Sequence, residues 1–111
     1  MVPDDPELLK HPRVYFLADS FFLEDLKELA INKFSCTLEK LWLSESLVDC
    51  VAEIYANTSE KADELRMEVI RVIVQHREEL LATKTFQVYV QEGGDFALDL
   101  VQGLVRTHGF M

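Results

Sequence analysis

The sequence predicts an all-α fold, with six to seven short helices in an irregular orthogonal bundle and no substantial sheet. Apolar residues recur at three- and four-residue spacing almost everywhere, which is the period of a helix face. Four glycines and three prolines in 111 residues leave little sequence for long linkers. An apolar share of 49% is enough to build a core, and the length suggests one domain.

The chain opens with a polar tail over residues 1–10. Pro12 then fits the first turn of a helix that we expect to end near Ser20, because proline is tolerated where no backbone N–H is needed. The apolar face of this helix consists of Val14, Leu17, Ala18 and Phe21. Three further aromatic residues fall outside that face, namely Tyr15, Phe16 and Phe22. We therefore expect this helix to be buried on two sides.

A second helix is predicted over about residues 23–34, followed by a short turn of one or two helical turns. The apolar stripe of this helix consists of Phe22, Leu23, Leu26, Leu29, Ala30 and Phe34. Leu38, Leu41 and Trp42 supply the apolar residues of the turn. We interpret Trp42 as a plug in a core or between domains rather than a ligand platform, because a tryptophan buries so much area.

Two longer helices come next. Ser46 is a candidate cap for the first, with Asp49 three residues on and an end near Asn57. The second is predicted to be the longest helix, over about residues 60–82, with Thr58 and Ser59 as candidate caps. It carries two apolar stripes, which is typical of a central helix packed on more than one side.

The C-terminal part is predicted to contain two short helices. Residues 85–92, TFQVYVQE, alternate like a strand but also fit a helical face, and we expect a helix because a lone strand has nothing to pair with. Gly93-Gly94 breaks this helix, and Asp95 is a candidate cap for the last one. Arg106, His108 and Gly109 are the expected closing residues of that helix.

Charge and cysteine content restrict the function classes. The net charge of −9 makes nucleic acid and membrane surfaces poor partners, because an acidic surface repels phosphates. Cys36 and Cys50 show no CxxC spacing, which favours a reduced protein of the cytoplasm or nucleus. The first ten residues do not fit a signal peptide, and no run is long enough for a membrane helix.

No arrangement of residues points to catalysis. His11, His76 and His108 lie far apart, and none has a cysteine or histidine partner at ligand spacing. GxSxG, GxGxxG and P-loop motifs are absent from the sequence. The sequence therefore predicts no catalytic, cofactor-binding or metal-binding residues and no cofactor, and we expect a protein that is not an enzyme. His76 lies on an apolar stripe, so we expect a partly buried, hydrogen-bonded histidine.

Two ordered blocks of the sequence carry a family resemblance. The first is VYFLADSFFLEDLKELAINKF, residues 14–34. It resembles the pattern YxLADKYxxxxLKxLAxxKF in the C-terminal helical half of BTB/POZ domains, with Phe21 in the place of tyrosine. The second is VAEIYANTSEKADELRMEVI, residues 51–70. It is similar to the stretch that follows the POZ helices in many fungal BTB proteins, with Tyr55, Asn57-Thr58 and Leu65-Arg66 in place.

The resemblance implies a division of the chain. Residues 11–45 would be the C-terminal helices of a BTB/POZ-like domain. Residues 46–111 would be a BACK-like helical extension, packed as one unit with the helices before it. Since the β-containing half of such a domain is not in this sequence, the chain is expected to be a fragment.

The resemblance also implies a function, namely a non-catalytic adaptor or scaffold for protein–protein interaction. A ubiquitin-ligase adaptor that docks a cullin is one version of it. The alternative is a self-contained helical regulatory domain, for example a transcription-associated one, without a cullin-adaptor role.

The interaction surface is expected where aromatic residues lack neighbours within the chain. The turn Ser20-Phe21-Phe22 replaces a more polar one of the family, so we expect it to pack tightly or to contact a partner. The candidate surface residues are Tyr15, Phe16, Phe21, Phe22 and Trp42. Orphaned apolar faces tend to find one another, so we expect a homo-oligomer.

Overall fold

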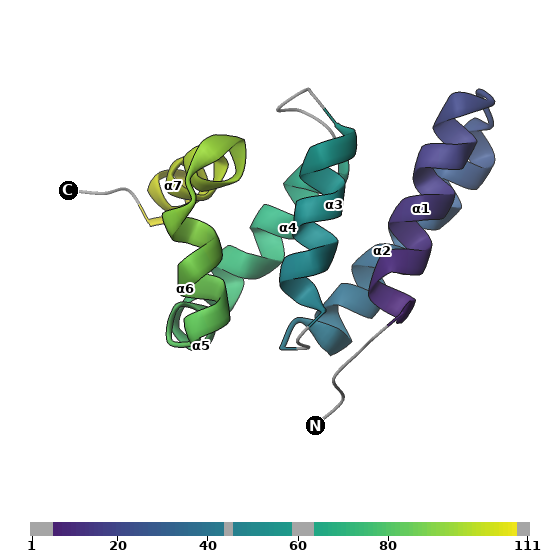
Figure 1. Cartoon of the computed structure of the whole chain (residues 1–111). Coiled ribbons are helices and arrows are strands. Elements are labelled where there is room, and N and C mark those ends of the chain that lie inside the picture. The colour runs from purple at the N-terminus through teal and green to yellow at the C-terminus, as the bar shows by residue number, and fades with distance from the viewer. Residues whose placement is uncertain (1–5, 44–45, 59–63, 109–111) are drawn as a thin grey trace. The chain divides into compact units, whose positions relative to one another are not determined.

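The computed structural model describes residues 6–43, 46–58 and 64–108. These residues form seven helices and no strand, so the predicted all-α class is confirmed (Figure 1). The helices are α1 (Pro6–Ser20), α2 (Glu24–Leu41), α3 (Leu47–Asn57), α4 (Glu64–Gln75), α5 (Arg77–Leu81), α6 (Lys84–Gln91) and α7 (Gly94–His108). None of the described helices has the length and apolar character that crossing a membrane requires.

The chain divides into an N-terminal unit, residues 1–59, and a C-terminal unit, residues 60–111. The N-terminal unit contains α1, α2 and α3, and the C-terminal unit contains the other four helices. The family-based boundary between residues 45 and 46 differs from this division, since α3 groups with the two helices before it. The assignment of the parts to BTB/POZ-like and BACK-like regions stays a prediction.

Helix α1 begins at Pro6, six residues before the predicted start at Pro12. The prediction of a polar tail up to residue 10 was therefore wrong for residues 6–10, while residues 1–5 lie outside the described part. Pro6 stands at the first helical position, where a missing N–H costs nothing. Leu8 has no exposed surface, so burial of its side chain draws this segment into the helix.

Pro12 lies inside α1, fully buried. A proline in a helix cannot donate to the carbonyl four residues earlier, which here is that of Leu8. The Cys50 thiol on α3 donates to this carbonyl oxygen, at 3.3 Å. Burial raises the pKa of Cys50 to about 12, so the thiol keeps its proton. The gap in the hydrogen bonding of α1 is thereby filled from α3.

A second link between α1 and α3 lies at the surface. The Arg13 guanidinium donates from Nε to Glu53 Oε2 at 2.7 Å and from Nη2 to Glu53 Oε1 at 2.9 Å. This is the bidentate geometry in which a guanidinium matches a carboxylate best. The hydrogen bond from Arg13 lowers the pKa of Glu53 below its usual value.

Helix α2 is longer than predicted, because it runs through the expected turn to Leu41. Nothing between Phe34 and Leu41 breaks a helix, and Leu38 continues the buried stripe of Ala30 and Phe34. Helix α3 ends at Asn57, as predicted. Ser46 occupies the N-cap position of α3, but its side chain makes no cap hydrogen bond, so the predicted capping box is not formed.

The predicted long helix over residues 60–82 is two helices, α4 and α5, separated at His76. The half-buried His76 has φ −114° and ψ 29°, outside the helical region. Arg77 Nη1 donates to the Val74 carbonyl at 2.9 Å, which satisfies a carbonyl that the break leaves open. The hydroxyl of Thr58, one of the two predicted caps, donates back to the Ile54 carbonyl at 2.8 Å. The other predicted cap, Ser59, lies outside the described residues.

The predicted helix over residues 85–92 is present as α6, and it ends at the predicted glycine pair. Gly93 has φ +75°, a conformation that glycine adopts without strain. Helix α7 begins at Gly94, so Asp95 lies in its first turn and is not its cap. Gly109 lies outside the described residues. Phe96 on α7 packs edge-on against Phe86 on α6, with ring centroids 6.0 Å apart.

At Gly103, α7 packs closely against α4 within the C-terminal unit. A Cβ atom at this position would lie 2.6 Å from Ile70 Cγ2 and 3.3 Å from Val74 Cγ2. Both neighbours are β-branched and held by the α4 backbone, so neither can turn aside easily. A side chain at position 103 would therefore force the two helices apart.

We predict that Gly103→Ala destabilises the protein by about 1–2 kcal/mol, because the overpacking outweighs the better helix propensity of alanine. Chemical denaturation followed by circular dichroism measures this change. Gln102→Ala, at an exposed position one residue earlier, is the matched control and should be neutral or slightly stabilising. Equal stability of the two variants would contradict the close approach of α7 to α4.

We predict that the Arg13–Glu53 pair makes stability depend on pH in the acid range. Because the folded-state pKa of Glu53 is lowered, its contribution is present above the unfolded pKa of about 4.3 and disappears as pH falls through the folded pKa. Glu53→Gln should be less stable than the wild type at pH 7, and the difference should shrink towards pH 3. Unfolding free energies at several pH values test this, with Glu28→Gln, at an exposed position of α2, as the control.

Candidate protein-binding surface

The turn between α1 and α2 is closed by a pair of backbone hydrogen bonds. The N–H of Leu23 donates to the Ala18 carbonyl at 2.9 Å, and the N–H of Phe22 donates to the Asp19 carbonyl at 3.2 Å. This pattern is a Schellman motif, in which the residue after the cap adopts a left-handed conformation. The motif turns the chain over three residues, so that α1 and α2 form an antiparallel hairpin (Figure 1).

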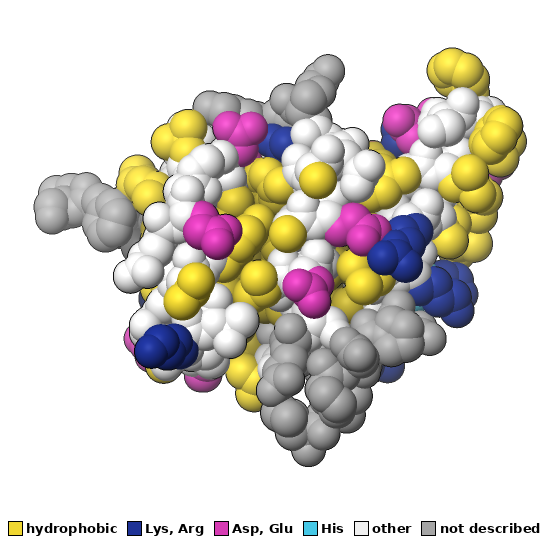
Figure 2. Space-filling view, in the orientation of Figure 1, with side chains coloured by type: hydrophobic (Ala, Val, Ile, Leu, Met, Phe, Trp, Pro, Cys, Tyr) yellow, Lys and Arg dark blue, Asp and Glu magenta, His cyan; other side chains and the backbone are white. Residues whose placement is uncertain are grey.

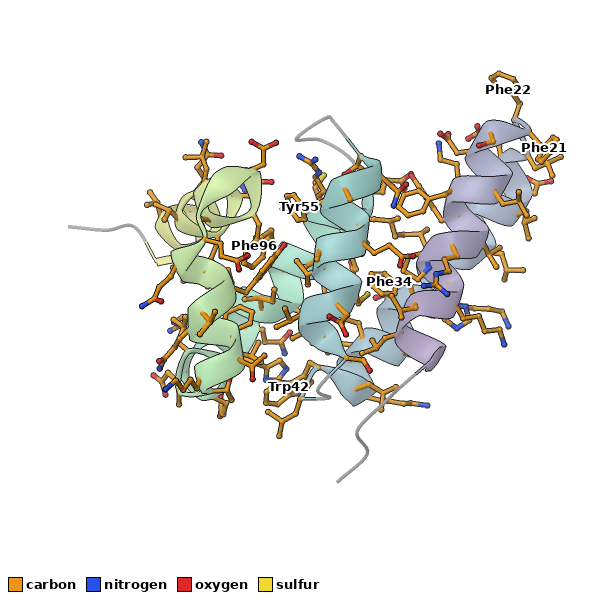
Figure 3. The ribbon with its side chains drawn as sticks, viewed as in Figure 1. Phe21, Phe22, Phe34, Trp42, Tyr55 and Phe96 are labelled. Atoms are coloured by element: carbon orange, nitrogen blue, oxygen red, sulfur yellow. The ribbon has the colours of Figure 1, made fainter. Side chains whose placement is uncertain are left out.

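The left-handed position of this motif is occupied by Phe22, with φ +58°. Glycine usually stands here, because a Cβ atom in this conformation crowds the backbone and costs roughly 1–2 kcal/mol. The Phe22 side chain gains nothing from packing, since 86% of its surface is exposed. In Figure 3 it projects away from the end of the hairpin.

Leu23, the next residue, is also an unusual residue type for its position. Leu23 stands at the N-cap of α2, where serine, threonine, aspartate or asparagine would accept a backbone N–H, and it makes no cap hydrogen bond. Half of the Leu23 side chain is exposed. Two successive positions thus carry apolar residues where folding alone favours glycine and a polar cap.

These two residues belong to a larger exposed apolar area, which we call the hairpin surface. It consists of Leu17, Phe21, Phe22, Leu23, Leu26 and Leu29, each with more than a third of its side chain exposed. Figure 2 shows hydrophobic side chains gathered at the turn end of the α1–α2 hairpin. A contiguous apolar area on a protein surface commonly marks a site of protein–protein contact.

Lys27 of α2 connects the two helices of the hairpin beside this surface. Its Nζ donates to Asp19 Oδ1 at 2.9 Å, and this bond raises the pKa of the lysine. The same nitrogen lies 5.3 Å from the centroid of the Tyr15 ring, within the range of a cation–π contact. The charge of Asp19 is therefore matched within the hairpin.

The five residues predicted for the interaction surface do not form one patch. Phe21 is 64% exposed, and together with Phe22 it lies on the hairpin surface. Tyr15 is only 4% exposed, so its place on the surface is corrected to a place in the core. Phe16 is half-buried. Trp42 is half-buried and directly follows the C-terminal end of α2, whereas Phe22 lies before its N-terminal end (Figure 3).

Sequence reasoning missed four members of the hairpin surface, namely Leu17, Leu23, Leu26 and Leu29. All four belong to the apolar stripes of the first two predicted helices, and none of them was a predicted surface residue. The signal was the width of the α2 stripe, which spans more of the helix than one neighbouring helix can cover. The structure buries Ala30, Phe34 and Leu38 of α2 and leaves Leu26 and Leu29 outside.

Two buried charged residues of the described structure, Arg66 and Asp99, lie in the C-terminal unit. No set of three or more histidine, cysteine, aspartate or glutamate side chains in the described structure is placed to hold a metal ion. Arg66 on α4 is buried, and its Nη1 lies 3.8 Å from Asp95 Oδ2 on α7. Asp99 is buried on the same helix as Asp95. The Arg66 charge is buried, whereas its partner Asp95 is mostly exposed.

We predict that Phe22→Gly stabilises the protein by about 0.5–1 kcal/mol, because relief of the left-handed strain exceeds the entropy cost of glycine. Phe22→Ala is the control, since it removes the ring but keeps the strain and should change the stability little. Urea unfolding curves of the three proteins measure the difference. Loss of stability in the glycine variant would show that the ring packs in the folded chain.

Comparisons with protein-family models, with curated proteins and with solved structures give no match to this chain.

Proposed function

We propose that this protein is a non-catalytic protein–protein interaction module that binds through the hairpin surface. The observation that carries the proposal is the combination of strain and exposure at the turn between α1 and α2. A phenylalanine in a left-handed conformation and a leucine at an N-cap both reduce stability, and both are displayed to solvent. Departures from local folding rules are expected where function requires them.

Aromatic and aliphatic side chains at the end of a rigid hairpin suit a binding role. Phenylalanine supplies a large contact area at a small cost in side-chain entropy, and residues of this kind are enriched in the centres of interfaces. The Schellman hydrogen bonds and the Lys27–Asp19 pair hold the turn in place before a partner arrives. A preorganised surface loses less entropy on binding.

The BTB/POZ resemblance gives this proposal its specific form, an intracellular adaptor or scaffold. A cullin is the partner class that the ubiquitin-ligase version names, and self-association is the other expectation from the sequence. Both stay predictions. The residues of the hairpin surface all lie within residues 14–34, the stretch that carries the resemblance. Within this stretch the turn Ser20-Phe21-Phe22 differs from the family pattern by its aromatic residues, and their exposure supports a role in binding.

Site-specific photo-crosslinking tests the proposal. We predict that the full chain with p-benzoylphenylalanine in place of Phe22 forms covalent adducts with protein when cells that express it are irradiated. Leu29→Asp in the same chain should reduce the adducts, because it places a charge within the hairpin surface. Mass spectrometry of the adducts identifies the partner.

The control places the photo-reactive residue at Gln87, at an exposed position of α6. Adducts at position 22 that do not exceed those at position 87, or that persist with Leu29→Asp, would contradict binding through the hairpin surface. A purified cullin titrated against the wild type and the Leu29→Asp variant tests the adaptor version separately.

A further inference from the structure

One exposed ridge of α2 carries charge in a definite order. Asp25, Leu29 and Lys33 follow one another at four-residue spacing, so they lie on one side of the helix, and all three are exposed. Asp25 is next to the turn and Leu29 is in the middle. Lys33 follows Asp25 by eight residues, which is about 12 Å along the helix axis. The ridge therefore has an acidic end, an apolar centre and a basic end.

Helix α1 also has a basic residue away from the turn and apolar residues towards it. Lys10 and Leu17 are seven residues apart, which places them on one side of α1, and Phe21 follows in the turn four residues after Leu17. All three are exposed. Since α1 runs antiparallel to α2, both lysines lie away from the turn and both apolar groups lie towards it. Figure 2 shows Lys and Arg side chains further along the hairpin from its apolar end.

The charges of the ridge are not used within the described structure. Lys27, on the same helix as the ridge, forms an ion pair with Asp19 of α1. Asp25 and Lys33, by contrast, take part in no ion pair among the residues described. Asp25 does lie in the first turn of α2, where the helix dipole favours an anion. Lys33 stands in the middle of the helix, where the dipole gives no such reason for a charge.

We propose that the hairpin surface binds a second copy of this chain, with the two α2 helices antiparallel across Leu29. This inference rests on the proposed function and names the partner. A two-fold axis at Leu29 brings the leucines of the two copies together, and it places Asp25 of each copy opposite Lys33 of the other. The apolar centre is covered and both charged ends are matched.

Charge order favours this occupant over others. A ridge that reads acid, apolar, base is complementary to itself when one copy is turned around, which is the isologous relation of a two-fold dimer. A parallel arrangement would set Asp25 against Asp25 and Lys33 against Lys33, which is unfavourable. A partner of uniform charge would match one end of the ridge and be repelled at the other.

Single charge reversals test the arrangement with the full chain. Asp25→Lys makes both ends of the ridge basic, and Lys33→Glu makes both ends acidic. In the proposed dimer each variant alone places like charges at two sites, so each should self-associate at least about tenfold more weakly than the wild type. An equimolar mixture restores two opposite-charge pairs, and it should recover association close to that of the wild type.

Sedimentation equilibrium over a range of concentrations measures these constants, and the double variant Asp25→Lys/Lys33→Glu should also recover. Glu92→Lys and Lys84→Glu make the same charge changes at exposed positions of the C-terminal unit and should behave like the wild type. Thermal unfolding of each variant checks that α2 remains folded, and recovery in the mixture excludes loss of folding as the cause.

Several outcomes overturn the inference. They are a wild type that is monomeric at every concentration, variants that associate as the wild type does, and a mixture that fails to recover. A monomeric wild type with adducts at position 22 to a different protein would overturn the second copy and leave the proposed function standing. A monomeric wild type without such adducts would remove both.

Discussion

The Schellman turn at Phe22 is the constraint on which the N-terminal unit depends. Its two hydrogen bonds reverse the chain within three residues and set α2 against α1. The turn needs a left-handed residue, and this sequence supplies a phenylalanine instead of a glycine. The residue with the strained backbone is also the one whose side chain is most exposed on the hairpin surface. Folding and display of the surface are therefore linked at one residue, because the turn that forms the hairpin also directs Phe22 into solvent.

The hairpin is fixed to α3 by contacts of two different kinds. Pro12 removes a donor from α1, and the Cys50 thiol supplies another to the open carbonyl of Leu8 in a buried setting. Arg13 and Glu53 form a bidentate pair at the surface between the same two helices. The first contact satisfies a buried polar group, which is costly to leave open, and the second adds orientation. Together they connect α1 to α3.

Charge on this protein acts at two scales. The whole chain carries −9, which opposes association with anions and, at long range, with copies of itself. Along the exposed ridge of α2 the sign of the charge changes, from Asp25 next to the turn to Lys33 two helical turns further on. Local order of this kind selects a relative orientation, because matched ends attract and mismatched ends repel at short distance. The long-range repulsion is screened at physiological salt, whereas contacts at the surface persist.

The sequence alone determined the helical class and the breaks that depend on single residues, such as the end of α6 at Gly93. Backbone preference and hydrophobic period are local properties, so they can be read from neighbouring residues. It also placed Phe21 and Phe22 among the candidate surface residues. Only the tertiary structure decided which side of each apolar stripe is covered, and so moved Tyr15 into the core and left Leu26 and Leu29 outside. It also decided the break at His76 and the left-handed Phe22, since neither residue type signals such a conformation. The physical reason is that burial and turn geometry depend on neighbours distant in sequence, which no local pattern specifies.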